Sequence, residues 1–93
     1  MRLDIFLKIS RLIQRRSLAQ DFCDAGLVKV NDAPAKSSKE IKAGDEIEIK
    51  RRNRLTKIAV EIVPDKKQMS KGDSESLYNI ISDELLQDEE RLP

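Results

Sequence analysis

The sequence predicts an α+β fold: an N-terminal helix-loop-helix packed on a small, mostly antiparallel sheet, followed by an acidic amphipathic C-terminal helix. This prediction comes from the spacing of the apolar residues. They recur at helical spacing over the first 25 residues, alternate in short runs between residues 27 and 62, and return to helical spacing after residue 74. The 93-residue chain therefore divides into a domain over residues 1–63, a linker over 64–74 and the C-terminal helix over 75–93.

The first expected helix has an apolar face and a polar face. The apolar residues follow the i, i+4, i+7, i+8 spacing of one helix face and are Ile5, Ile9, Leu12 and Ile13. The complementary polar stripe consists of Asp4, Lys8, Arg11 and Arg15. Its three cations are either ordinary charge on a solvated face or contacts to a polyanion.

A second helix is expected to begin at Ser17. Ser17 and Gln20 have the S-x-x-Q spacing of a capping box, and Gly26 is placed to end the helix in a left-handed conformation. Arg15 and Arg16 then stand at the corner between two helices, where guanidinium groups and unpaired backbone N–H groups together suit a phosphate. Cys23 falls on the apolar face of this helix, which indicates a core thiol.

Short alternating runs predict the strands. Residues 27–30 form the first run and end at the turn dipeptide Asn31-Asp32. Residues 33–35 contain Pro34 and predict an edge strand, because proline cannot donate to a ladder. Residues 47–49 and 58–62 predict two more strands. The cations between them suggest a flexible hairpin tip that is either simply solvated or a secondary RNA contact: Arg51, Arg52 and Arg54.

The C-terminal third is acidic. Residues 1–57 carry a net charge of +6 and residues 58–93 a net charge of −5. After the polar linker, apolar residues at i, i+3, i+4 and i+8 predict a helix starting near Ser74; they are Leu77, Ile80, Ile81 and Leu85. Phosphate would repel the acids of this helix. We therefore expect it to cover the sheet or to meet a protein instead of RNA.

Composition excludes several functional classes. The chain has no histidine and one cysteine, so an internal disulfide and a histidine base are excluded, and we expect no cofactor, no metal site and no enzymatic activity. No apolar run exceeds the length of Ile58-Ala59-Val60, which is too short for a membrane span. We expect a cytoplasmic monomer that does not contact membranes.

A DNA-binding helix-turn-helix protein is an alternative that also has two helices and a basic corner. Its recognition helix would need to present base-reading side chains to the major groove. The second helix here exposes mainly Gln20, Asp21 and Asp24, and the two acids would be repelled by the groove. RNA binding through phosphates at the corner explains the pattern better.

Five segments in this order resemble a known domain: Arg2–Leu7, Ser10–Ile13, Arg15–Ala19, Gly26–Asn31 and Lys42–Ile47. They are similar to the RNA-binding domain first described in ribosomal protein S-four, over about residues 2–52. That resemblance implies a helix-loop-helix packed on a small sheet. Asp32 departs from the family, which usually has glycine after the asparagine, and this leaves the turn type open.

Among stand-alone forms of this domain, the chain most resembles ribosome-associated quality-control factor P (the RqcP family). The opening residues, the Arg15-Arg16 pair and the short acidic tail carry the likeness. Heat-shock protein fifteen, a ribosome recycling factor, is the alternative, but it has a long basic C-terminal extension.

The resemblance implies binding to rRNA of the obstructed large ribosomal subunit and to peptidyl-tRNA, beside an RqcH-type tailing factor that adds alanine to stalled chains. It assigns rRNA contacts to Arg2 and Arg16, and also to Arg11 and Arg15. The full set of candidate RNA-binding residues is Arg2, Lys8, Arg11, Arg15, Arg16 and Ser17.

Overall fold

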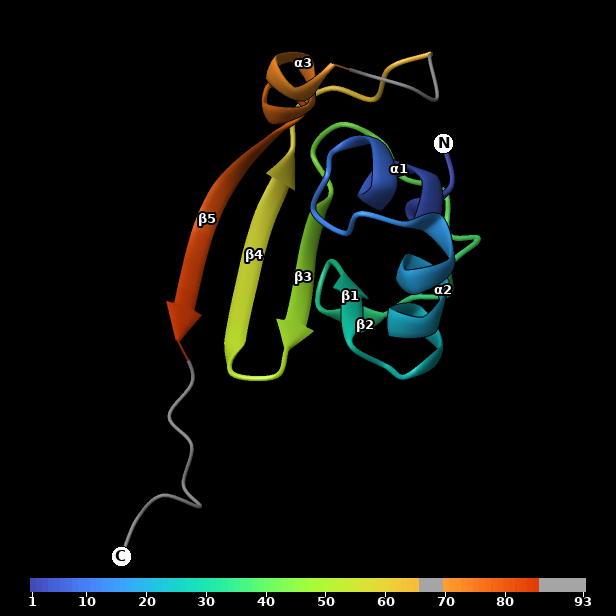
Figure 1. The fold of residues 1–93 in the computed structure, drawn as a ribbon, viewed down its shortest axis with the longest axis vertical. Coiled ribbons are helices and arrows are strands. Elements are labelled where there is room, and N and C mark those ends of the chain that lie inside the picture. Colours follow the sequence, from blue (N-terminus) through green and yellow to red (C-terminus); the bar gives the residue numbers. More distant parts are fainter. Residues whose placement is uncertain (66–69, 86–93) are drawn as a thin grey trace, which may run out of the picture.

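The computed structural model describes residues 1–65 and 70–85 and confirms the α+β class (Figure 1). The elements in chain order are α1 (Leu3–Ile9), α2 (Arg16–Asp24), β1 (Val28–Val30), β2 (Ala33–Pro34), β3 (Glu46–Arg51), β4 (Arg54–Val60), α3 (Lys71–Glu75) and β5 (Tyr78–Leu85). The two N-terminal helices lie beside the β1 and β3 side of the sheet, whereas β5 forms its far edge (Figure 1). No helix among the described residues combines the length and the hydrophobicity needed to cross a bilayer.

The first helix is shorter than predicted. It ends at Ile9 with Ser10 as its C-cap, and Arg11 then takes a left-handed conformation with φ of 63°. Ile13 is still buried, because the chain turns back and its N–H donates to the Leu7 carbonyl at 3.1 Å. The predicted polar stripe from Asp4 to Arg15 is therefore wrong: Arg11 lies beyond the helix, and Asp4 is fully buried.

The second helix begins at Arg16, with Arg15 as its N-cap and no side-chain capping bond. The capping box predicted at Ser17 is not formed, because the Gln20 amide donates instead to Asp4 at 2.8 Å. Gly26 has φ of 76° and follows the C-cap Ala25, which confirms the predicted left-handed stop. Cys23 is buried in the core, also as predicted.

All strands pair antiparallel in one sheet of order β2-β1-β3-β4-β5. Asn31 and Asp32 both have positive φ, 51° and 71°, so the β1–β2 hairpin closes with a type I′ turn although no glycine is present. Asparagine and aspartate tolerate this left-handed conformation better than other residues with a β-carbon. The predicted edge strand containing Pro34 is confirmed as β2.

The β3–β4 hairpin is tighter than predicted. Arg51 pairs with Arg54 in the ladder, so only Arg52 and Asn53 lie outside the strands. Arg54 forms an ion pair with Asp83 at 3.2 Å, and the Arg51 guanidinium donates to the Leu12 carbonyl. The prediction that these arginines share a flexible tip is wrong for Arg51 and Arg54, which neighbouring elements hold in place.

The helices and the inner face of the sheet enclose one hydrophobic core. The side chains that are less than 2% exposed include Leu3, Phe6, Leu7, Ile41, Ile47, Ile49 and Ile58. Their alternation along β3 and β4 places every second residue inward, whereas glutamates and lysines between them face outward. This core fixes the N-terminal end of α1 beside the start of α2.

The helix predicted over residues 75–93 is wrong for the residues described. Residues 71–75, mostly in the predicted linker, form α3, and residues 78–85 form β5, paired along β4. The spacing of the apolar residues is compatible with either a helix or a strand. The β-branched residues Ile80 and Ile81 favour a strand, and β4 provides an edge with which it can pair. Of the apolar residues used, only Leu77 is buried. The rest of that prediction, residues 86–93, lies outside the described residues.

Candidate nucleic-acid interface

A buried carboxylate organises the corner between the two helices. Asp4 accepts a hydrogen bond from the Ile5 N–H at 2.7 Å and two from the Arg2 guanidinium at 3.2 Å. It also accepts from Arg16 Nε at 3.2 Å and from Gln20 Nε2 at 2.8 Å. Residues 2 and 16, which lie far apart on the chain, are therefore held around one anion.

The electrostatics keep this carboxylate charged. Burial raises the pKa of Asp4, but hydrogen bonds from Gln20, Arg16 and Arg2 outweigh that effect and leave its pKa below the ordinary value of 3.8. At neutral pH the cluster thus contains one anion and two guanidinium cations, and it keeps a net positive charge.

Both guanidinium groups remain accessible. The side chains of Arg2 and Arg16 are 43% and 46% exposed, whereas that of Asp4 is 0% exposed. Arg16 uses only its Nε toward Asp4, so its two terminal amino groups remain available to bind an anion. Because the buried carboxylate orients each guanidinium, less side-chain freedom is lost when a phosphate binds.

The first turn of α2 adds donors to the same corner. The side chain of its N-cap residue, Arg15, does not accept a hydrogen bond from the helix. The first N–H groups of the helix, which have no partner within the helix, therefore receive no side-chain cap. Ser17 is exposed in this turn, and Arg15 and Arg16 are exposed beside it. The combination of unpaired N–H groups, a hydroxyl and guanidiniums is suited to phosphate oxygens.

The remaining predicted residues lie at different places. Lys8 is exposed on α1, and Arg11 is exposed in the connection that follows the helix. Arg52, at the hairpin tip, has no hydrogen bond or ion pair with any described residue, whereas Arg51 is held against Leu12. The structure thus brings Arg2 and Arg16 together at Asp4, whereas Arg52 takes no part in that cluster.

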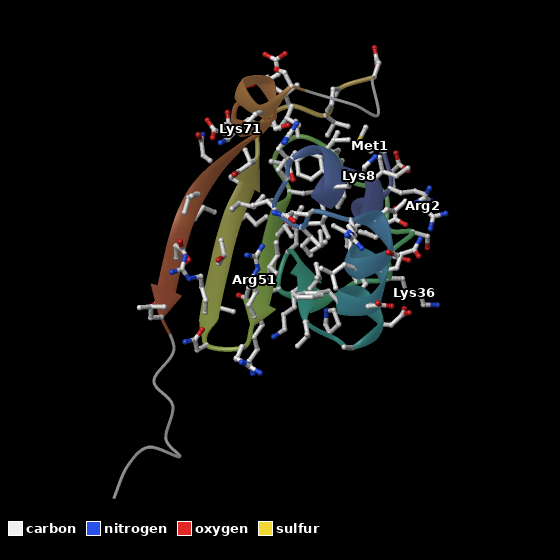
Figure 2. All side chains as sticks on the ribbon, viewed as in Figure 1. Met1, Arg2, Lys8, Lys36, Arg51 and Lys71 are labelled. Carbon is white, nitrogen blue, oxygen red and sulfur yellow. The ribbon has the colours of Figure 1, made fainter. Side chains whose placement is uncertain are left out.

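Sequence reasoning missed two lysines beside this corner. The segment after β2 runs along the start of α1, where Leu3 N–H donates to the Lys39 carbonyl at 2.8 Å and Asp4 N–H to the Ser37 carbonyl at 3.1 Å. Figure 2 shows Arg2 and Lys36 on the same side of the molecule, away from β5. The segment Lys36-Ser37-Ser38-Lys39 was visible as two cations around two hydroxyls, but no spacing rule linked it to residue 2.

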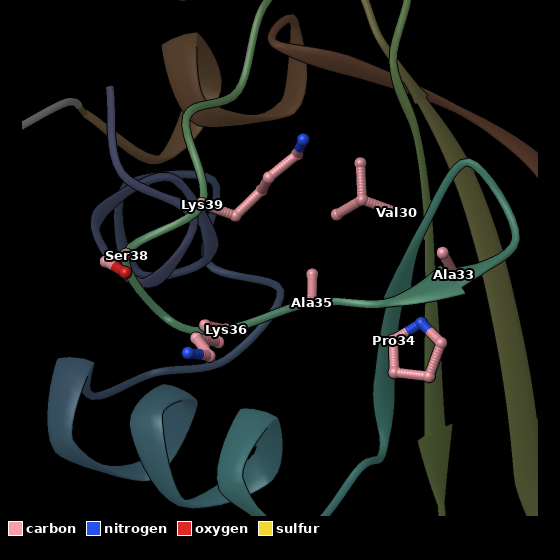
Figure 3. A pocket seen from close by; sticks show the side chains of 7 residues that line it. All are labelled: Val30, Ala33, Pro34, Ala35, Lys36, Ser38 and Lys39. Carbon is pink, nitrogen blue, oxygen red and sulfur yellow. The ribbon is translucent and has the colours of Figure 1, made fainter.

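A shallow pocket lies along this segment (Figure 3). Its volume is about 270 Å³, and its lining residues are Val30, Ala33, Pro34, Ala35, Lys36, Ser38 and Lys39. Val30, Ala33, Pro34 and Ala35 make part of its lining apolar, and Lys36 and Lys39 place two cations at it.

The Cys23 thiol is held in its protonated form. Burial, together with the negative charges of Asp4 and Asp24, raises the pKa of the Cys23 thiol to about 11, so it stays protonated at neutral pH. No cluster of histidine, cysteine, aspartate or glutamate in the described ranges could hold a metal ion. On the outer face of the sheet, the carboxylates of Asp32 and Glu46 raise the pKa of Lys57, which stays charged and forms ion pairs with both.

Comparison with known proteins identifies the family. Residues 1–47 match the family model described as the S4 domain. A protein of Streptococcus pneumoniae named "RQC P-site tRNA stabilizing factor" is 42% identical over 83 residues, which is 89% of this chain and 92% of that protein. This chain belongs to the S4-domain family of RQC P-site tRNA stabilizing factors.

Further relatives support the assignment to the RQC P-site tRNA stabilizing factors. The Bacillus subtilis factor of the same name is 38% identical over 86 residues, covering 92% of this chain and 98% of that protein. Among solved structures, the trimeric heat shock protein 15 of Vibrio cholerae superposes with a TM-score of 0.79 at 28% identity, over 88% of this chain and 82% of that chain. The family resemblance inferred from the five N-terminal segments is thus confirmed.

Proposed function

We propose that this protein is a non-catalytic RNA-binding factor that binds rRNA of the obstructed large ribosomal subunit together with peptidyl-tRNA. In this role it supports ribosome-associated quality control and the alanine tailing of stalled nascent chains. The observation that carries the proposal is the pair of guanidiniums oriented by buried Asp4. The names of the relatives, RQC P-site tRNA stabilizing factors, supply the biological setting.

The geometry of the corner supports the proposed RNA contacts. Arg16 and Arg2 each present a planar donor set that suits two oxygens of one phosphate. Ser17 and the first N–H groups of α2 complete the phosphate site, and Lys8, Arg11 and Arg15 extend the positive field around it. Lys36 and Lys39 belong to the segment that is hydrogen-bonded to the start of α1, and they add positive charge near Arg2.

Structured RNA is a better ligand for this surface than DNA. The accessible side of α2 carries Asp21 and Asp24, which are exposed and would face the phosphates that flank a major groove. Single-strand binding relies on stacked aromatic side chains. Phe6 is fully buried, and Phe22 and Tyr78 are partly buried against the core. Backbone recognition of a folded RNA remains as the mode that these residues support.

The remaining partners complete the proposal. We propose that the protein acts as a monomer beside an RqcH-type tailing factor, which performs the chemistry. The non-catalytic role is supported by the protonated, buried Cys23 and by the absence of histidine from the sequence. The factor then acts by holding tRNA and rRNA in place and not by changing a covalent bond.

The test uses large ribosomal subunits with and without bound peptidyl-tRNA. We expect the protein to sediment preferentially with subunits that carry peptidyl-tRNA, and to stimulate alanine tailing when the tailing factor is added. In binding assays, log affinity should fall against log salt with a slope of about 0.7 to 0.9 for each phosphate neutralised. Equal binding to intact ribosomes and to loaded subunits, or an affinity independent of salt, would overturn the proposal.

A further inference from the structure

The outer edge of β5 is open. β5 ends the strand order, and no strand of the described residues pairs with its far side (Figure 1). β5 runs over 8 residues, from Tyr78 to Leu85, and its backbone N–H and C=O groups that do not pair with β4 point outward on both sides of a bulge at Ile81, where the alternation is interrupted. The opposite edge of the sheet differs, because β2 has 2 residues and one of them is Pro34. Short length and proline protect the β2 edge, whereas β5 is longer, contains no proline and is interrupted only at the bulge at Ile81.

Apolar side chains accompany this open edge. Ile80, Ile81 and Leu85 are 58%, 50% and 67% exposed. Ile80 pairs directly with Ile58, which is fully buried, so both side chains point to the same face of the sheet. The core face of the sheet thus continues past β4, where the described helices do not cover it, and an added strand would bury this part of it.

The charge around the edge selects what can bind there. Residues 71–85 contain one lysine and four acids, a net charge of −3. Asp83 already accepts hydrogen bonds from Arg54 and Thr56. Glu84 is exposed and makes no hydrogen bond or ion pair with a described residue. An RNA backbone would be repelled, and two β5 strands placed side by side would bring acids of the same sign together.

We propose that the β5 edge binds an extended cationic segment of another protein, which adds to the sheet as a further strand. Its backbone would pair with the open N–H and C=O groups of β5, and its apolar side chains would cover Ile80. Its lysine or arginine side chains would meet Glu84. This surface is distinct from the Arg2 and Arg16 corner, which lies at the helical side of the molecule, so both can be occupied together.

The test uses the full-length protein and a synthetic peptide of the same length as β5, with alternating lysine and valine. Amide hydrogen exchange and NMR shift mapping would show where it binds. We expect added amide protection in β5, from residue 78 to 85. Two further peptides carry N-methyl groups on every second residue, in the two alternative phases. The peptide whose methyl groups replace the N–H hydrogens that face β5 should bind about tenfold more weakly or worse, although its charge is unchanged.

Two variants of the protein test the charge. Glu84→Lys should weaken peptide binding several-fold, whereas Asp21→Lys on α2, an equal charge reversal at an exposed site, should leave it unchanged. The proposal is overturned if both methylated peptides bind as well as the parent, if the two variants behave alike, or if no peptide protects β5. Concentration-dependent protection of β5 without peptide would also overturn it, because a second copy would then be the occupant. The peptide comparison uses the unaltered protein, so it stands even if a variant fails to fold.

Discussion

Replacing Asp4 by asparagine tests whether the carboxylate holds the helical corner together. The substitution keeps the size of the side chain and removes its charge. In the structure the Asp4 carboxylate accepts from Ile5 and Arg2 through Oδ1, and from Arg2, Arg16 and Gln20 through Oδ2. An asparagine that keeps its oxygen toward Ile5 turns its own N–H groups toward the donors of Arg16 and Gln20.

The expected loss of stability follows from those contacts. Hydrogen bonds to a charged group contribute about 1.5–3 kcal/mol each, but the two arginines are nearly half exposed and recover part of this in water. We therefore expect Asp4→Asn to lower the free energy of unfolding by about 2–3 kcal/mol at neutral pH. For a chain of this size, the melting temperature should fall by roughly 10–20 °C.

The stability that the Asp4 charge contributes should depend on pH. Because the folded pKa of Asp4 lies below 3.8, its charge stabilises the fold fully above that value, and the contribution is lost as pH falls through the folded pKa. The assay is chemical denaturation of both proteins in a pH series from about 7 down to about 2. The gap between wild type and variant should be largest at neutral pH and should close in acid.

The control for this experiment is Asp21→Asn, which removes an exposed carboxylate from α2. It should change stability by less than about 0.5 kcal/mol. An Asp4→Asn gap that is equally small, or one that persists unchanged in acid, would refute the assignment of Asp4 as the charged centre of the corner.

Three further predictions concern binding, packing and reactivity. Arg16→Ala should weaken large-subunit binding by about 5- to 150-fold, and by more than Arg52→Ala does. Thermal melts check that both variants are folded, and a larger loss of binding for Arg52→Ala would contradict the corner site. Leu77→Ala should cost about 2–4 kcal/mol in denaturation experiments, because this side chain is only 1% exposed. Cys23 should react with iodoacetamide in the folded protein far more slowly than in denaturant, and rapid labelling at neutral pH would contradict its burial and raised pKa.

Local patterns predicted much of the N-terminal domain. Alternating apolar residues predicted the first four strands, Gly26 predicted the end of α2, and Pro34 predicted an edge strand. Each of these signals lies within a few residues of the feature it predicts, so periodicity and turn chemistry are sufficient to find it. The family and the candidate contact Arg2 came instead from the order of five segments over the first half of the chain.

The tertiary structure decided whatever depends on residues distant in the chain. Asp4 looked like part of a solvated stripe, and only the packing of α1 against α2 shows it buried between Arg2 and Arg16. Lys36 and Lys39 join the same surface because backbone hydrogen bonds attach their segment to α1. Residues 78–85 had helical spacing but form a strand, because pairing with β4 supplies hydrogen bonds that no short window of sequence can reveal. Spacing along the chain reports which face a residue prefers, whereas the partner on that face is chosen by the whole fold.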